Sequence, residues 1–214
     1  MKFGMRAVLA LLLCLSSVGA DADDSRDGGG TTSGMKEVER RLEQPPRTPS
    51  GTRVEVAPSG RDPMTHFFDQ SFGNLKEELV QVRAEGKTGM LVMFNDPDCP
   101  WCQKMKATVM SRPEVQDYYR KHFRSLHIDT RGDTVITDFS GREMSEKDFA
   151  FKENRVRATP VFVFFGLDGK PMMRFTGVTA DTEEFLWLGE FVVSGAYKNS
   201  NFTAYKRARQ ADKK

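Results

Sequence analysis

Beyond the first twenty residues, two uninterrupted hydrophobic runs stand out in a chain whose apolar and polar residues are otherwise largely mixed. Residues 90–94 (MLVMF) and 161–165 (VFVFF) are each five apolar residues long. Runs of this length, bounded by turn residues, are typical of strands that are buried on both faces of a sheet. Shorter apolar runs predict further strands over residues 123–128 and 172–175, the second of them after a tight Asp-Gly turn.

The segments between these strands have apolar residues at helical spacing. Leu75, Leu79 and Val82 recur on one face of a predicted helix that Asn74 caps. A small hairpin is expected over residues 135–144. Spacing and capping sequences predict further helices over residues 103–110, 111–122, 145–154 and 181–193.

Three of those helices begin at a recognisable cap. Ser111 opens a capping-box sequence, Ser145 is expected as an N-cap, and Asp181 opens a second capping box. The alternation of helices and buried strands predicts an α/β domain over residues 64–195. The basic segment 196–214 is expected to be a C-terminal tail that is frayed, with a docking tail as the alternative.

The N-terminus has the pattern of an export signal. Two positive residues, Lys2 and Arg6, precede a nine-residue apolar run, and small residues follow up to Ala20. This order predicts a secretory signal peptide over residues 1–20. The run is far shorter than the roughly 20 apolar residues of a membrane span, so we expect no stable membrane insertion after cleavage. A lipoprotein signal with lipidated Cys14 is the alternative, although Leu13 is a poor residue before such a cysteine.

Residues 21–63 are expected to form a flexible leader. They are rich in Gly, Ser, Thr and Pro and contain few large apolar side chains, so they cannot bury enough surface to offset the entropy of ordering.

Composition excludes several classes of protein. The chain has 214 residues, of which 38% are hydrophobic and 29% charged. It is too apolar to be wholly disordered and too polar for several membrane spans. The formal net charge of +2 supports no nucleic-acid partner.

A pair of cysteines lies where a buried strand runs into a helix. Cys99-Pro100-Trp101-Cys102 follows a turn after residues 90–94. Unpaired N–H groups and the dipole at a helix N-terminus favour a thiolate, so Cys99 is the candidate nucleophile. Cys102, one turn further in, is the candidate resolving thiol, and Pro100 suits the first helical position. Such a pair performs thiol–disulfide exchange.

The chain resembles the thioredoxin superfamily in three features. These are the CPWC sequence after a buried strand, Ala158-Thr159-Pro160 before a second apolar strand, and the Asp168-Gly169 hairpin before a C-terminal helix. The resemblance implies a thioredoxin fold with a central mixed sheet flanked by helices, and a small hairpin insertion before the cis-proline.

Residues 132–141 and 156–160 look most like those of SoxW-type periplasmic thioredoxins. That resemblance implies a periplasmic enzyme that reduces protein disulfides, linked to sulfur oxidation or cytochrome maturation. Its electron donor would be a membrane thiol transporter of the CcdA type.

The resemblance also assigns substrate contacts. Thr159-Pro160 is similar to the family's cis-proline, which faces the cysteines and offers the backbone of the preceding residue to an extended substrate segment. Trp101 and Pro100, between the cysteines, are expected to be exposed and to contact substrate.

One position departs from the family. Thioredoxins usually bury a carboxylate six residues before the first cysteine, where this chain has Met93. Asp96 and Asp98 come directly before Cys99, and their charge would oppose thiolate formation. Glu77 and Glu78, on a surface helix, are poor replacements for the missing acid.

Other interpretations of the cysteines remain open. They could form a structural disulfide, or the domain could be a binding or chaperone module that uses the proline groove without turnover. A disulfide-donating oxidase is the alternative within redox chemistry.

No metal or other cofactor is expected, because zinc sites need four ligands and the three histidines, His66, His122 and His127, show no partner spacing. Eight aromatic residues are interpreted as core: Phe67, Phe68, Phe151, Phe162, Phe164, Phe165, Phe175 and Trp187.

Overall fold

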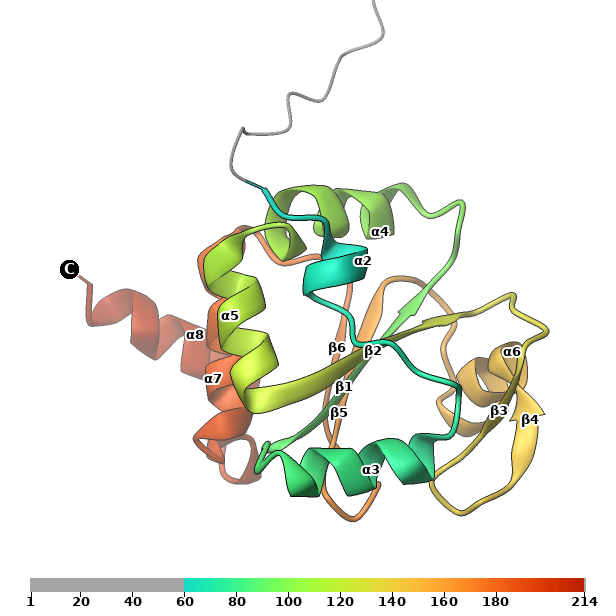
Figure 1. Cartoon of the computed structure of the whole chain (residues 1–214). Helices are drawn as coiled ribbons and strands as arrows, with labels where there is room; N and C mark the ends of the chain where they lie inside the picture. The colour runs from blue at the N-terminus through green and yellow to red at the C-terminus, as the bar shows by residue number, and fades with distance from the viewer. Residues whose placement is uncertain (1–59, 214) are drawn as a thin grey trace, which may run out of the picture. The chain divides into compact units, whose positions relative to one another are not determined.

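Four strands form a central mixed sheet in the order β2-β1-β5-β6 (Figure 1). The structure, a computed structural model, describes residues 60–213. The predicted signal peptide with Cys14 and residues 21–59 of the predicted leader lie outside the described residues. β1 (Gly89–Asn95) runs parallel to β2 (Phe123–Asp129) and antiparallel to β5 (Val161–Phe165). β6 (Pro171–Thr176) pairs antiparallel with β5. The predicted thioredoxin fold is confirmed.

The two hydrophobic runs occupy the centre of this sheet. Every residue of β1 and β5 is buried, which confirms the expectation from their unbroken apolar sequence. Met93 points into the core on one face of β1, and its neighbour Val92 points into the core on the other face.

Helices cover both faces (Figure 1). α4 (Pro100–Met105), α5 (Pro113–His122) and α7 (Thr182–Val193) contribute side chains to the core on the Met93 face. α3 (Leu75–Ala84) packs on the Val92 face, beside the hairpin of β3 (Val135–Thr137) and β4 (Glu143–Ser145). The short helices are α2 (Pro63–His66), α6 (Glu146–Asp148) and η3 (Ala196–Lys198).

Three of the expected caps form as predicted. The side chain of Asn74 accepts the N–H of Glu77, that of Ser145 accepts the N–H of Asp148, and that of Asp181 accepts the N–H of Glu184.

The expected cap at Ser111 is wrong. Arg112 is the N-cap of α5, with no side-chain cap hydrogen bond, and Pro113 is the first helical residue. The helix after the cysteines continues as a π-helical turn, η1 (Lys106–Met110). Ser111 therefore ends that turn, and its hydroxyl donates to the carbonyl of Ala107 over 2.7 Å. A second π-helical turn, η2 (Phe149–Glu153), follows α6.

Both ends of the described chain are held more firmly than expected. At the N-terminal end, Arg61 pairs with Asp117 of α5 at 2.6 Å, within the segment assigned to the leader. At the other end, the expected frayed tail contains the helix α8 (Phe202–Ala211). The centre of the Phe202 ring lies 5.8 Å from the ring centres of Phe175 in β6 and Phe191 in α7. The apolar side chain of Phe202 therefore packs the tail against these two elements.

Of the eight aromatic residues assigned to the core, Phe151 is the exception, being 41% exposed. It lies in the π-helical turn η2, beside the buried residues Phe149 and Ala150, and the centre of its ring lies 5.7 Å from the guanidinium of Arg157.

Candidate active site

The cysteine pair lies at the junction of β1 and α4. β1 ends at Asn95, a three-residue turn follows, and Cys99 is the N-cap of α4 with Pro100 as its first residue. The buried strand therefore carries the chain to the end of the sheet, and the helix begins where its unpaired N–H groups face Cys99. The predicted position of the pair is confirmed.

The two thiols are close and unequal. Both are free, and the backbone N–H of Cys102 donates to Cys99 Sγ over 3.1 Å. Cys99 is 9% exposed, whereas Cys102 is fully buried. Solvent and substrate therefore reach Cys99 first.

The surroundings move the two pKa values apart. Burial alone would raise the pKa of Cys99, but hydrogen bonds involving Cys102, Thr159 and the backbone of Trp101 outweigh it and hold that pKa below its ordinary value. Burial, followed by the hydrogen bond to Cys99, raises the pKa of Cys102 to about 11. The outer sulfur therefore ionises at a lower pH than the inner one.

Thr159 and Pro160 lie against this pair. The Thr159–Pro160 bond is cis, as expected, and Pro160 is buried directly before β5. The thiol of Cys99 donates to the carbonyl oxygen of Thr159 over 3.5 Å. Because β5 is the antiparallel neighbour of β1, the sheet brings together residues that are 60 positions apart.

The two residues between the cysteines face outward. Pro100 is exposed and Trp101 is 57% exposed, as the sequence predicts. The ammonium group of Lys104 lies 5.4 Å from the centre of the Trp101 ring, a cation–π arrangement on one side of the indole.

Sequence reasoning missed Arg131, which binds the turn before Cys99. Its guanidinium lies 2.8 Å from Asp96 Oδ1 and 2.6 Å from Asp98 Oδ2. The two aspartates expected to oppose the thiolate therefore share a counter-charge. The parallel pairing of β1 and β2 could have suggested such a contact, since the strands end side by side at Asn95 and Asp129.

Met93 confirms the departure from the family pattern. It is fully buried in the same core cluster as Cys99, Cys102 and Met105. An apolar thioether thus occupies this position, as the sequence predicts. Glu77 is exposed on α3, and Glu78 of the same helix forms a salt bridge with Arg124 of β2. Neither residue therefore replaces the family's buried carboxylate.

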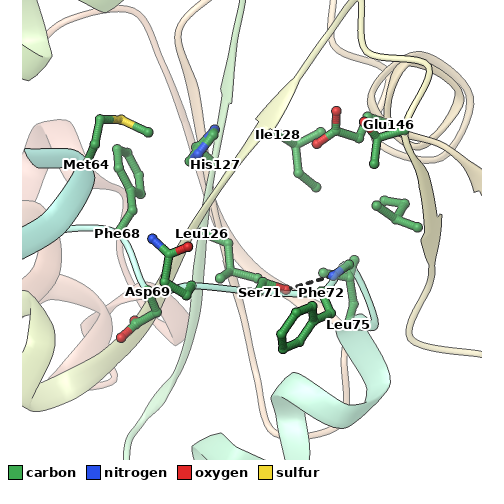
Figure 2. A pocket seen from close by; sticks show the side chains of 14 residues that line it. Met64, Phe68, Asp69, Ser71, Phe72, Leu75, Leu126, His127, Ile128 and Glu146 are labelled. Carbon is green, nitrogen blue, oxygen red and sulfur yellow. Dashed lines mark hydrogen bonds between the residues drawn. The ribbon is translucent and has the colours of Figure 1, made fainter.

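His127 faces a cavity that the cysteines do not line. His127, on β2, lines a cavity of about 340 Å³ with Met64, Phe68 and Glu146, and neither cysteine contributes to its wall (Figure 2). Within residues 60–213, no cluster of three or more His, Cys, Asp or Glu side chains is suited to hold a metal ion.

None of the helices described between residues 60 and 213 combines the length and apolar character needed to cross a membrane.

Several solved structures are similar to this chain. A thioredoxin-fold protein from Helicobacter pylori is 21% identical, with a TM-score of 0.49 over 59% of this chain and 86% of that one. A thioredoxin from Thermus thermophilus is 26% identical, with a TM-score of 0.44 over 55% and 82%. The reduced C-terminal domain of Neisseria meningitidis DsbD is 17% identical, with a TM-score of 0.41 over 54% and 91%. No curated protein matches the chain.

One protein-family model matches the part of the chain that contains both the central sheet and the cysteine pair. The family model described as "Thioredoxin-like domain" matches residues 75–192, which is more than half of the chain and includes both cysteines and Pro160. The chain therefore belongs to the thioredoxin-like family.

Proposed function

We propose that this protein is a thiol–disulfide oxidoreductase in which Cys99 attacks and Cys102 resolves. The observation that carries the proposal is the hydrogen bond from the Cys102 N–H to Cys99 Sγ at the start of α4. It stabilises a thiolate on the sulfur that solvent reaches, while the second sulfur stays one helical turn behind it.

The chemistry proceeds in two exchanges. The Cys99 thiolate attacks one sulfur of a substrate disulfide, so that a mixed disulfide forms and the other substrate sulfur leaves as a thiolate. Cys102 then loses its proton to the solvent or to the departing sulfur and attacks Cys99 Sγ. The substrate leaves with two thiols, and two electrons have passed from the cysteine pair to it.

Substrate binding is assigned to the surface around the pair. Trp101 and Pro100 supply an exposed apolar patch. The backbone of Thr159, beside Cys99, is placed to pair with an extended segment as an added strand does. Pro160 holds the end of that surface against the core.

The biological setting is also part of the proposal. The export signal predicted at residues 1–20 favours the periplasm, where the substrates would be protein disulfides. A reducing role then requires electrons from outside that compartment, which a CcdA-type membrane thiol transporter would supply. The links to sulfur oxidation or cytochrome maturation rest on the SoxW-type resemblance.

Insulin reduction tests the enzyme activity. With dithiothreitol as electron source, the chain should accelerate insulin precipitation, and both Cys99→Ser and Cys102→Ser should abolish the acceleration. A wild-type chain that binds reduced or unfolded protein but leaves insulin oxidised would identify a binding module instead.

Equilibration with glutathione tests the direction of electron flow. A reductant should hold its Cys99–Cys102 disulfide at a potential near the thioredoxin value of about −270 mV. A potential near the DsbA value of about −120 mV would instead identify a disulfide-donating oxidase.

A further inference from the structure

The turn that carries Cys99 is clamped from the neighbouring strand by one arginine. Arg131 lies just beyond β2, and its side chain bridges the carboxylates of Asp96 and Asp98. Asp96 Oδ1 also accepts the N–H of Asp98 over 2.8 Å. One guanidinium thus holds both aspartates of the turn between β1 and α4.

Asp96 connects this clamp to both cysteines through its backbone. Its carbonyl oxygen accepts the N–H of Cys99 over 3.1 Å. Its N–H favours the ionised form of the Cys102 sulfur. A displacement of Asp96 would therefore disturb the hydrogen bond that positions the backbone of Cys99 at the start of α4.

The base of Arg131 is itself anchored. Its backbone N–H donates to Asp129 Oδ1 over 2.8 Å, and the N–H of Thr130 donates to the carbonyl of Asn95 over 2.8 Å. The loop that carries the guanidinium is thereby tied to the ends of both β1 and β2. Because the backbone is fixed, only the Arg131 side chain has to be ordered for it to reach Asp96 and Asp98.

The local charge balance depends on this one cation. The groups that face Arg131 are Asp98, Asp96 and Asp129, and hydrogen bonding to Asp98 is the largest influence that keeps Arg131 charged. The titratable group that faces Cys99 is Cys102. Without Arg131, the carboxylates of Asp96 and Asp98 would lie in the turn before α4 without a salt-bridge partner among the described residues.

We propose that Arg131 is a positioning residue for the redox centre. By bridging Asp96 and Asp98, it compensates one of the two negative charges of the turn before Cys99 and fixes the Asp96 backbone, which holds the N–H of Cys99. This inference rests on the proposed function only in treating the cysteine pair as the reacting centre. Arg131 acts through the aspartates and does not itself touch the substrate.

The test is the rate at which iodoacetamide alkylates Cys99 in the full reduced chain, mapped by mass spectrometry across pH. The variants are Arg131→Gln, Arg131→Lys, Asp98→Asn and the double variant Arg131→Gln/Asp98→Asn. Arg142→Gln is the matched control, because Arg142 bridges Asp138 and Glu153 at 2.8 and 3.0 Å in the same manner.

The proposal predicts opposite effects for the two kinds of change. At a pH below the Cys99 transition and at low salt, Arg131→Gln should slow alkylation about threefold, since uncompensated carboxylates disfavour the thiolate. Asp98→Asn should accelerate it, and the double variant should return close to the wild-type rate. Arg131→Lys should recover part of the rate, because Lys keeps the positive charge but carries it on a compact ammonium group instead of a planar guanidinium.

Salt separates the charge effect from the positional effect. About 1 M salt shortens the screening length to about 3 Å, so it should reduce the difference between Arg131→Gln and the wild type. Any difference in alkylation rate that persists in about 1 M salt measures the effect of displacing the turn between β1 and α4. Arg142→Gln should leave the pH profile of alkylation unchanged at both salt concentrations.

Identical alkylation profiles for wild type, Arg131→Gln and Asp98→Asn would overturn the proposal, as would an equal slowing by Arg142→Gln. The measurement needs no turnover, so it stays separate from the proposed function. A chain that fails to reduce insulin but shows the Arg131 effect would refute the oxidoreductase role and leave this inference standing.

Discussion

Met93 and His127 occupy the same register position on the parallel strands β1 and β2. Paired residues of neighbouring strands leave the same face of a sheet, and Met93 lies in the core cluster that contains both cysteines. The face beneath the cysteine pair is therefore apolar at its centre, with an imidazole one strand further out.

Replacing Met93 with an acid should affect both stability and chemistry. Met93→Asp should lower the free energy of unfolding by about 3 kcal/mol or more, because an acid is buried without a partner. Burial raises the pKa of such a carboxyl group, so the loss should grow as pH rises through that pKa. Urea denaturation across pH and the pH profile of disulfide exchange measure the two effects.

Val92→Asp provides the matched control. Val92 is equally buried on the same strand but faces away from the cysteines. It should destabilise the protein similarly and leave the pH profile of exchange unchanged. If Met93→Asp also left that profile unchanged, position 93 would not act on the cysteines.

The two cysteines should behave differently when one is removed. Because Cys99 is the less buried of the two cysteines and has the lowered pKa, Cys102→Ser should accumulate mixed disulfides with substrate proteins. Cys99→Ser should accumulate none, since its remaining thiol is buried and has a pKa of about 11. Non-reducing electrophoresis measures the trapped species, and equal trapping by both variants would refute the assignment.

Asp138 should make the hairpin loop sensitive to acid. Burial opposes its ionisation, but hydrogen bonds from Arg142 and Ser140 prevail and hold the pKa of Asp138 below its ordinary value. A lowered pKa in the folded state stabilises the fold at neutral pH, and that contribution is lost as pH falls below about 4.

Asp138→Asn should therefore cost about 1–3 kcal/mol at pH 7, and the cost should shrink in acid. Thermal unfolding between pH 3 and pH 7 measures it, with Asp133→Asn as the exposed control. A cost that does not change with pH would show that the carboxylate charge is not responsible.

The C-terminal helix should contribute to stability. Phe202→Ala should lower the free energy of unfolding by about 1–3 kcal/mol, because the half-buried ring packs on Phe175 and Phe191. Thr203→Ala, at the exposed neighbouring position, should be close to neutral. Equal stability of the two variants in urea denaturation would mean that α8 does not pack on α7 in solution.

Much of the fold could be predicted because its signals are local. The strands over residues 90–94 and 161–165 are short continuous apolar runs bounded by turn residues, a pattern typical of a strand buried on both faces. The position of Cys99 at a helix start follows from the adjacent strand and from Pro100. These features depend on residues that are neighbours in the sequence.

The features that sequence reasoning missed depend on distant or competing contacts. Ser111 had the sequence of a cap, but its hydroxyl binds the carbonyl of the preceding turn. The helix at the C-terminus depends on apolar partners in α7 and β6. Arg131 lies 33 residues from Asp98, so only the pairing of β1 with β2 reveals the contact.

The different exposure of the chain's two tryptophans gives the protein two separate optical probes. Trp101 lies between the reacting sulfurs and is largely exposed, whereas Trp187 is 6% exposed within α7. Indole emission responds to the polarity and quenching groups around the ring. Oxidation of the cysteines or docking of a partner should therefore change the emission of Trp101, and unfolding should change that of Trp187. In Trp187→Phe the remaining emission reports oxidation or docking at Trp101, and in Trp101→Phe it reports unfolding around Trp187. Neither measurement needs an attached dye.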